Sequence, residues 1–182
     1  MALTATIYQF TVELSDVDRE VYETLDLRLA RQPSESAEYM VTRVLAYCLE
    51  YAEGIAFTQG VAAKDEPAVW VRDPTGKLLA WIEVGLPDAE RLHRGSRAAD
   101  RAAVYTHRDV EQFQKQLAGR RIYRAGEIPI YALDRRFIEQ LASLVDRRTG
   151  LAITVTEGQL FVAIGDKVLD TQITEYRIPQ DA

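Results

Sequence analysis

Hydrophobic and polar residues alternate through the first 31 residues, and a short polar segment, residues 15–19, divides the alternation into two runs. Successive side chains of a β-strand point to opposite faces, so alternation is typical of strands that bury only one face. The pattern predicts two long strands at residues 3–14 and 22–31, joined by a tight turn.

A helical period replaces the alternation after Pro33. Ser34 and Ser36 each offer a side-chain oxygen that can cap a helix N-terminus. The apolar residues that follow recur at helical spacing: Val41, Val44, Leu45, Cys48 and Ala52. This spacing predicts a helix that buries one stripe of side chains, with Cys48 in the core rather than acting as a nucleophile.

Two apolar runs, residues 65–72 and 77–85, flank a Pro/Gly turn in the middle of the chain and predict a β-hairpin. Acidic residues lie at its open end, with Asp65 and Glu66 opening the first strand and Glu83 closing the second. Carboxylates held together repel one another, and a divalent cation offsets that repulsion. The mouth of the hairpin therefore predicts a site for Mg²⁺ or Mn²⁺.

Helical and strand patterns alternate through the remainder of the chain. We expect helices from Pro87 and at residues 109–118 and 134–145, and strands at residues 102–106, 121–124, 128–133, 151–156, 160–164 and 168–176. A strand, helix, strand run of this length is typical of a right-handed crossover between parallel strands. The predicted class is α/β (an α+β mixed sheet) in a single domain spanning residues 1–182.

The composition is that of an ordinary globular protein, with 47% hydrophobic and 27% charged residues. No apolar run approaches the roughly 20 residues that span a bilayer, so no membrane partner is expected. The single cysteine excludes an internal disulfide and a zinc framework. The N-terminus lacks the positive charge of a secretory signal, and a cytoplasmic location is the expectation.

The net charge of −6 disfavours a protein that coats long duplex nucleic acid, because such proteins are normally basic. Contact with nucleic acid through a local basic patch stays open, and so does a protein partner. The oligomeric state is not determined by these features.

Short motifs spread over nearly the whole chain resemble the YaeQ family of bacterial proteins. They are Met1-Ala2-Leu3-Thr4-Ala5-Thr6-Ile7-Tyr8, Ala30-Arg31-Gln32-Pro33-Ser34-Glu35 with Glu38, Asp65-Glu66-Pro67 with Trp70, Trp81-Ile82-Glu83-Val84-Gly85-Leu86-Pro87-Asp88, and Val104-Tyr105-Thr106. The resemblance implies a variant of the PD-(D/E)XK nuclease-like superfamily. It would place a restriction-endonuclease-like core between added N- and C-terminal β-hairpins.

The motif of that superfamily has Pro-Asp on one strand and Glu-x-Lys on the next. Its two acids hold a metal ion, and its lysine positions or activates the water that attacks a phosphodiester. In this chain Ala68 follows Pro67, and Gly85 stands where the lysine would be, so Glu83 is the motif carboxylate in register. No organic cofactor is implied.

Other residues near the hairpin offer replacements for the missing groups. A hairpin loop of two or four residues would place Glu66 on the same face as Glu83, whereas a loop of three would place Asp65 there. Glu35 and Glu38 are expected in the first turn of the first helix, where the resemblance implies a further acid, and Glu38 is the one assigned as a metal ligand. Arg94 would face phosphate in place of the lysine, although its high pKa prevents it from acting as a base.

The expected metal ligands are thus Glu38, Asp65, Glu66 and Glu83, and the expected catalytic residues are Glu83, Glu66 and Arg94. Three arginines, Arg94, Arg97 and Arg101, share one helical stripe that is either a phosphate-binding face or a solvent face. Trp70 and Trp81 are either core residues or a platform for base stacking. His93 and His107 have no partner spacing and receive no role.

Two functions of different classes fit these features. One is a divalent-metal-dependent phosphodiesterase with a degenerate motif. The other is a non-catalytic regulatory or binding protein on a nuclease-like scaffold, motivated by Ala68, Gly85 and the negative net charge. A carboxylate pocket for a small cationic or phosphorylated ligand is a third possibility with no distinctive motif.

Overall fold

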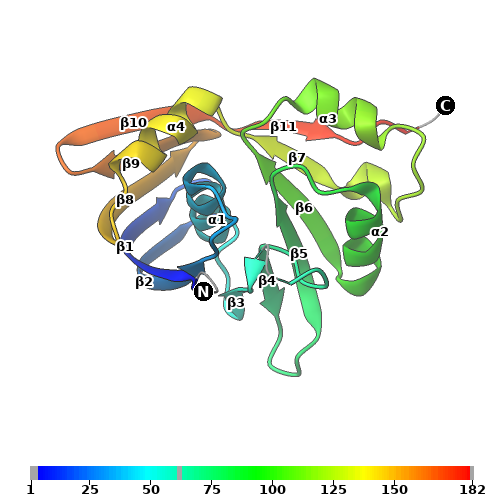
Figure 1. Ribbon diagram of the computed structural model, residues 1–182, viewed down its shortest axis with the longest axis horizontal. Helices are drawn as coiled ribbons and strands as arrows, with labels where there is room; N and C mark the ends of the chain where they lie inside the picture. The colour runs from blue at the N-terminus through cyan, green and yellow to red at the C-terminus, as the bar shows by residue number, and fades with distance from the viewer. Residues whose placement is uncertain (1–3, 61–62, 181–182) are drawn as a thin grey trace. The chain divides into compact units, whose positions relative to one another are not determined.

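The computed structural model describes residues 4–60 and 63–180, and the elements in these ranges are four α-helices and two mixed β-sheets (Figure 1). The predicted mixed α/β class is confirmed. Contacts divide the chain into two compact units, the first formed by the chain up to Val41 with Leu133–Ile173, the second by Thr42–Ala132 with the chain from Thr174 on. None of the helices in the described ranges has the length and apolar character that a membrane crossing requires.

The first unit contains a five-stranded sheet with the order β10-β9-β8-β1-β2. Its elements are β1 (Thr6–Asp16), β2 (Val21–Arg31), α4 (Arg135–Leu144), β8 (Arg148–Thr156), β9 (Gln159–Ile164) and β10 (Lys167–Gln172). Neighbouring strands are antiparallel except β1 and β8, which pair in parallel. The N-terminal hairpin and the C-terminal strands β8, β9 and β10 are parts of one sheet.

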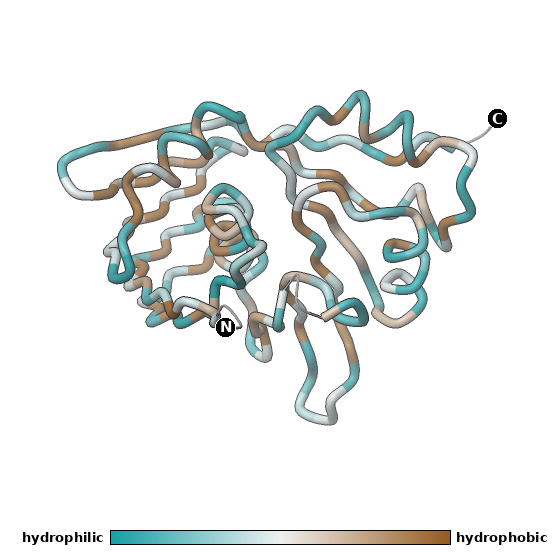
Figure 2. The backbone as a smooth tube through the Cα atoms, in the orientation of Figure 1, coloured by the Kyte–Doolittle hydropathy of each residue, from teal (hydrophilic) through white to brown (hydrophobic). Residues whose placement is uncertain are grey.

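One face of this sheet forms the core of the first unit. Along β1, Phe10, Val12 and Leu14 are buried, whereas Thr11 and Glu13 between them are exposed. The same alternation of hydrophobic and hydrophilic positions is visible along the strands of this sheet in Figure 2. The strands predicted in this sheet up to Ile164 are confirmed, with boundaries within three residues of those expected, and the predicted start at Leu3 lies outside the described residues.

The second unit contains a six-stranded sheet with the order β11-β7-β6-β5-β4-β3. Its strands are β3 (Ile55–Phe57), β4 (Val69–Arg72), β5 (Leu78–Val84), β6 (Arg101–Thr106), β7 (Pro129–Ala132) and β11 (Thr174–Arg177). β4 and β5 form the predicted antiparallel hairpin, and β5, β6 and β7 are parallel. The predicted crossover is confirmed as β5-α2-β6.

Helices cover both faces of this sheet. On one face α2 (Ala89–Ala98) and α3 (Val110–Leu117) enclose a core with Trp81, Val104 and Ile130 of the sheet. On the other face the end of α1 (Ala37–Leu49) is fastened to the sheet, because the Tyr105 hydroxyl donates a hydrogen bond to Glu50 at 2.8 Å. Both faces of β5 and β6 are therefore buried, as is usual for parallel strands.

Two predicted strands are wrong in part. Residues 121–124 do not form a strand: they run along α2 into the 3-10 turn Ala125–Glu127, and Arg124 adopts a left-handed backbone with φ of 50°. The single strand expected at residues 168–176 is two strands, β10 and β11, which belong to different sheets. It breaks at Ile173, whose N–H donates to the Gly158 carbonyl instead of to a neighbouring strand.

Two further differences concern the segment after the first helix. Val41, Val44, Leu45 and Cys48 are buried as predicted, but α1 ends at Leu49 and Ala52 is exposed in the following turn. The turn continues to Gly54, whose φ of 89° is a left-handed conformation that favours glycine. The short strand β3 follows it and was not predicted, since three residues are too few to establish an alternation.

Candidate functional site

The predicted acidic mouth of the hairpin lies at the carboxyl end of β5. Because β4 runs antiparallel to β5, the chain that enters β4 lies beside this end, and the Ala68 N–H donates to the Ile82 carbonyl at 3.1 Å. Val69 pairs with Ile82, so Ala68 and Glu83 are the next two residues across the hairpin. Ala68 thus stands opposite Glu83.

The Glu83 carboxylate is held by an arginine, Arg91 of α2. The Arg91 Nε donates to Glu83 Oε2 at 2.9 Å, and Nη2 donates to Oε1 at 3.1 Å. The same guanidinium donates to the carbonyl of Lys64 at 2.9 Å and to that of Glu66 at 2.6 Å. Four oxygens, two from a carboxylate and two from the main chain, therefore surround one guanidinium.

Local backbone geometry brings Arg91 to this position. After β5 the chain turns at Gly85, whose φ is 87°, and Asp88 caps α2 by accepting a hydrogen bond from the Arg91 N–H at 2.8 Å. Arg91 is the third residue of α2, and helical side chains incline toward the helix N-terminus. The guanidinium consequently lies beside the end of the strand that precedes the helix.

Glu83 is buried, with 4% of its side chain exposed, whereas 26% of the Arg91 side chain is exposed. Burial raises the pKa of Glu83, and the hydrogen bonds and charge of Arg91 oppose that shift. The Trp81 Nε1–H adds a third hydrogen bond to the carboxylate, at 3.0 Å. These three side-chain donors, from Arg91 and Trp81, hold the Glu83 carboxylate in one orientation.

The other acids at the mouth also have partners. Asp65 accepts a hydrogen bond from Arg94 at 2.6 Å, and Glu90 lies 3.9 Å from the same guanidinium. The carboxylate of Glu66 accepts a hydrogen bond from the Gln59 N–H at 3.2 Å. Arg94 therefore faces carboxylates in this structure.

Glu38 lies in the first turn of α1, in the first unit, whereas the other four predicted site residues lie in the second unit. Over residues 4–60 and 63–180, no group of three or more His, Cys, Asp or Glu side chains is arranged to hold a metal ion. The assignment of these residues to Mg²⁺ or Mn²⁺ remains a prediction.

Gly85, where the resemblance would place a lysine, lies outside the strand. β5 ends at Val84, and Gly85 has a left-handed backbone whose N–H donates to the Tyr105 carbonyl at 2.9 Å. A lysine there would have to adopt a positive φ, which side chains other than glycine disfavour. The departure from the motif at Gly85 is therefore a change of backbone as well as of side chain.

The predicted arginine stripe is partly wrong, because α2 ends at Ala98 and Arg101 is the first residue of β6. Arg101 pairs with the buried carboxylate of Glu50. The sequence analysis also missed Arg91. Its place three residues after the capping Asp88 is visible in the sequence, but nothing in that spacing links it to Glu83.

The two tryptophans face each other across the hairpin, where Trp70 pairs with Trp81. Trp81 is buried in the core and bonded to Glu83, so its ring is not open to a nucleic-acid base. The Trp70 ring is covered by the Arg72 guanidinium at 4.3 Å from its centroid.

Comparison with known proteins places this arrangement in a family. The family model described as YaeQ protein matches residues 1–173 of the chain. The chain belongs to the YaeQ family. It is 33% identical over 181 residues to the uncharacterized protein YaeQ of Escherichia coli (strain K12), and the match covers 98% of this chain and 99% of that relative.

Two solved structures show the same fold. The crystal structure of YaeQ protein from Pseudomonas syringae is similar with a TM-score of 0.86 at 31% identity, covering 97% of both chains. The YaeQ protein from Xanthomonas axonopodis pv. citri has a TM-score of 0.87 at 28% identity, covering 97% of this chain and 100% of that one. The family and the fold are thus established together for nearly the whole chain.

Proposed function

We propose that this YaeQ-family chain is a non-catalytic binding protein on a nuclease-like scaffold, in which Arg91 takes the place that a metal ion occupies in an enzyme. The observation that carries the proposal is the Arg91 guanidinium among four oxygens of Glu83, Lys64 and Glu66. Carboxylate and main-chain carbonyl oxygens are also the ligands that Mg²⁺ and Ca²⁺ take.

A guanidinium in this position supplies positive charge but no chemistry. Its geometry is planar, it offers only hydrogen-bond donors, and it is not deprotonated in proteins, so it neither activates water nor accepts a proton. Ala68 and Gly85 remove two further groups that the motif would use. The cluster then serves to tie the segment at residues 64–66 and α2 to the end of β5.

The second candidate is the metal-dependent phosphodiesterase. It is favoured by one observation, that Asp65, Glu66 and Glu83 do come from segments meeting at one end of the sheet, where active sites of α/β folds usually lie. In this function Arg91 would have to leave Glu83 before Mg²⁺ or Mn²⁺ could bind. The substrate of the enzyme would be a nucleic acid, whereas the non-catalytic protein would bind a nucleic acid or a protein as its partner. For either function the proposed location is the cytoplasm.

Metal titration of the wild-type chain and of two variants separates the candidates. For the non-catalytic protein we expect that millimolar Mg²⁺ or Mn²⁺ leaves the melting temperature of the wild type unchanged. Mn²⁺ should raise that of Arg91→Ala, whose four oxygens lack their cation. Cleavage of short DNA or RNA by the wild type with either metal, abolished in Glu83→Gln, would overturn this proposal in favour of the enzyme.

A further inference from the structure

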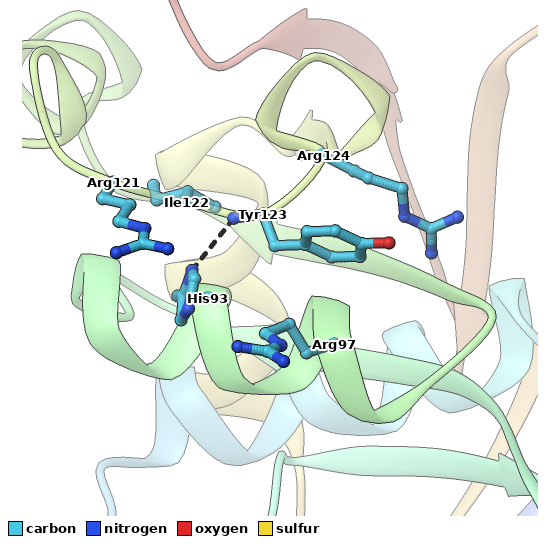
Figure 3. A pocket seen from close by; sticks show the side chains of 6 residues that line it. All are labelled: His93, Arg97, Arg121, Ile122, Tyr123 and Arg124. Atoms are coloured by element: carbon cyan, nitrogen blue, oxygen red, sulfur yellow. Dashed lines mark hydrogen bonds between the residues drawn. The ribbon is translucent and has the colours of Figure 1, made fainter.

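The structure contains a basic pocket between α2 and the segment that follows α3, lined by His93, Arg97, Arg121, Ile122, Tyr123 and Arg124 (Figure 3). We propose that this basic pocket binds a small phosphate ester, with Arg97 and Arg121 as the phosphate ligands. The proposal goes beyond the function above, because the pocket uses none of the residues of the Glu83–Arg91 pair.

Among the described residues, two of the three arginines that line the basic pocket, Arg97 and Arg121, have no carboxylate partner, whereas the Nε of the third, Arg124, lies 3.4 Å from Glu127 Oε2. None of the acidic residues in the described ranges lines the pocket, although acids outnumber bases by 28 to 22 in the chain. Within residues 4–60 and 63–180, Arg97 and Arg121 have neither an ion pair nor a side-chain hydrogen bond. Guanidinium groups gathered without a counter-charge repel one another, and a phosphate group, with its several acceptor oxygens, relieves that repulsion.

The walls of the basic pocket are fixed by hydrogen bonds to α2. The Tyr123 N–H donates to Nδ1 of His93 at 3.1 Å, the dashed line in Figure 3, and the Ser96 hydroxyl donates to the Tyr123 carbonyl. Because Nδ1 of His93 accepts, its ring proton is on Nε2, which is a further donor. His93 and the main chain of Tyr123 are held in this way, and they lose little conformational freedom when a ligand binds.

Arg124, the last residue that lines the basic pocket, has an unusual backbone conformation and is held by contacts of its side chain. Its backbone is left-handed, with φ of 50° and ψ of 40°, which costs about 1 kcal/mol for a residue with a side chain. Its Nη2 donates to the Asp100 carbonyl at 2.7 Å, and its guanidinium lies 5.3 Å from the centroid of the Tyr123 ring. The Arg124 side chain thereby ties the pocket segment to the loop between α2 and β6.

The size of the basic pocket selects the class of ligand. Its volume is about 650 Å³, within the range of sites for small organic ligands and larger than a free phosphate requires. Beside the arginines, 48% of Tyr123 is exposed and offers an aromatic face to the organic part of the ligand. A phosphate ester carrying a ring, such as a nucleoside 5′-monophosphate, matches both features.

Calorimetric titration tests this with four probes: a nucleoside 5′-monophosphate, the unphosphorylated nucleoside, and a short single-stranded oligonucleotide with either a 5′-phosphate or a 5′-hydroxyl. The variant Arg97→Gln/Arg121→Gln removes the two proposed ligands. Its matched control is Arg108→Gln/Arg120→Gln, which removes two exposed arginines of the same unit that do not line the pocket. Both variants lower the net charge by the same amount.

We expect the monophosphate to bind the wild type and the control equally and the Arg97/Arg121 variant at least roughly tenfold more weakly, the loss of a charge-assisted contact. The nucleoside should not bind. If only the 5′-phosphorylated oligonucleotide competes with the monophosphate for the pocket, the natural ligand is the phosphorylated end of a strand. If neither oligonucleotide competes with the monophosphate, the natural ligand is a free metabolite. Equal weakening in both double variants, equal binding of the two oligonucleotides, or no binding of the monophosphate at millimolar concentration would overturn the proposal.

Discussion

At the scale of single residues, the Glu83–Arg91 pair and the Arg94–Asp65 pair differ in burial, and their energies should differ accordingly. Glu83 is 4% exposed, whereas Asp65 is 89% exposed. Removing one partner of a buried pair leaves an uncompensated charge and costs about 3–5 kcal/mol, but an exposed pair contributes about 1 kcal/mol or less. We expect Arg91→Ala to lower the free energy of unfolding by the larger amount and Arg94→Ala by the smaller.

Urea denaturation of the two variants beside the wild type measures both losses. A third variant, Glu83→Leu/Arg91→Met, replaces the pair by apolar side chains and should recover most of the stability lost in Arg91→Ala. Similar losses in Arg91→Ala and Arg94→Ala would show that the Glu83 carboxylate reaches water, contrary to its burial.

Gly95 is a second residue whose role is testable, because α2 crosses the Trp81 ring at this position. A Cβ at residue 95 would lie 2.4 Å from both Cδ1 and Nε1 of Trp81. Alanine favours a helix over glycine by about 1 kcal/mol, but overpacking of a core costs about 1–3 kcal/mol. We expect Gly95→Ala to destabilise the chain and to move Trp81 off Glu83.

The loss is measured by urea denaturation with tryptophan fluorescence as the signal. Gly150→Ala is the control, since a Cβ at Gly150 meets nothing within 4 Å. A stabilised Gly95→Ala variant would mean that α2 can move away from β5 at little cost.

Sequence reasoning could identify the acids of the site but not their partner. The pairing of β4 with β5 follows from two apolar runs about a turn, and it brings Asp65 and Glu66 to the end of β5 that carries Glu83. Arg91 reaches Glu83 only because the backbone reverses at Gly85 before α2 begins, and the direction of such a turn is set by tertiary packing rather than by spacing. Among the several arginines of α2, periodicity alone does not select Arg91.

At the scale of secondary-structure elements, a buried polar network joins the end of α1 to β6. Glu50 accepts hydrogen bonds from Tyr105 at 2.8 Å and from Arg101, and burial raises the pKa of Tyr105 well above the usual 10.0. Below pH 10 the tyrosine is protonated in both the folded and the unfolded chain. Above it the unfolded chain loses the proton first, so stability falls as the pH rises from about 10 through the higher pKa of the folded state.

Tyr105→Phe isolates this contribution. At neutral pH we expect it to cost about 1.5–3 kcal/mol, the value of a hydrogen bond to a charged group. Because phenylalanine does not titrate, the difference between wild type and variant should narrow above pH 10, as measured by urea denaturation from neutral pH to about pH 11. Tyr131, whose pKa is also raised, is present in both chains, so its titration cancels in the difference between their stabilities. A difference that stays constant across this range would contradict a protonated, buried Tyr105.

Most elements were predictable because each is long enough to show the period of a strand or a helix, or begins at a recognisable capping residue. β1 and β2 are long enough to show alternation, and α2, α3 and α4 each begin at an aspartate that caps the helix. The failures occur where a segment is short or where tertiary partners decide. Residues 121–124 contain a strand-like Ile-Tyr pair but bond to α2, and the run from Val168 to Tyr176 is divided because its two halves pair with strands of different sheets.

At the scale of the whole molecule, each unit is assembled from two separate stretches of the chain. The first unit needs both the N-terminal hairpin and Leu133–Ile173, and the second needs β11, which follows Ile173. The link in the first unit is the parallel pairing of β1 with β8, where Gln9 stands opposite Arg148. Contacts between residues so distant in sequence slow folding, because a long loop must close before they form.

Because the first unit needs Leu133–Ile173, a truncated chain that ends at Ala132 should lose part of its structure. It retains β1 and β2 but lacks β8, and an isolated two-stranded hairpin is marginally stable in water. We therefore expect the amides of β1 and β2 to exchange with solvent deuterium nearly as fast as in an unfolded chain. A chain that ends at Ile173 retains β8, β9 and β10 and lacks only β11 of the second unit. In this chain the amides of β1 and β2 should stay protected from exchange. Hydrogen exchange read by mass spectrometry on peptides covering residues 6–31 distinguishes the two truncations. Strong protection of these peptides in the shorter chain would show that the hairpin of β1 and β2 is stable without β8. The pairing of β1 with β8 would then not be needed to form the hairpin.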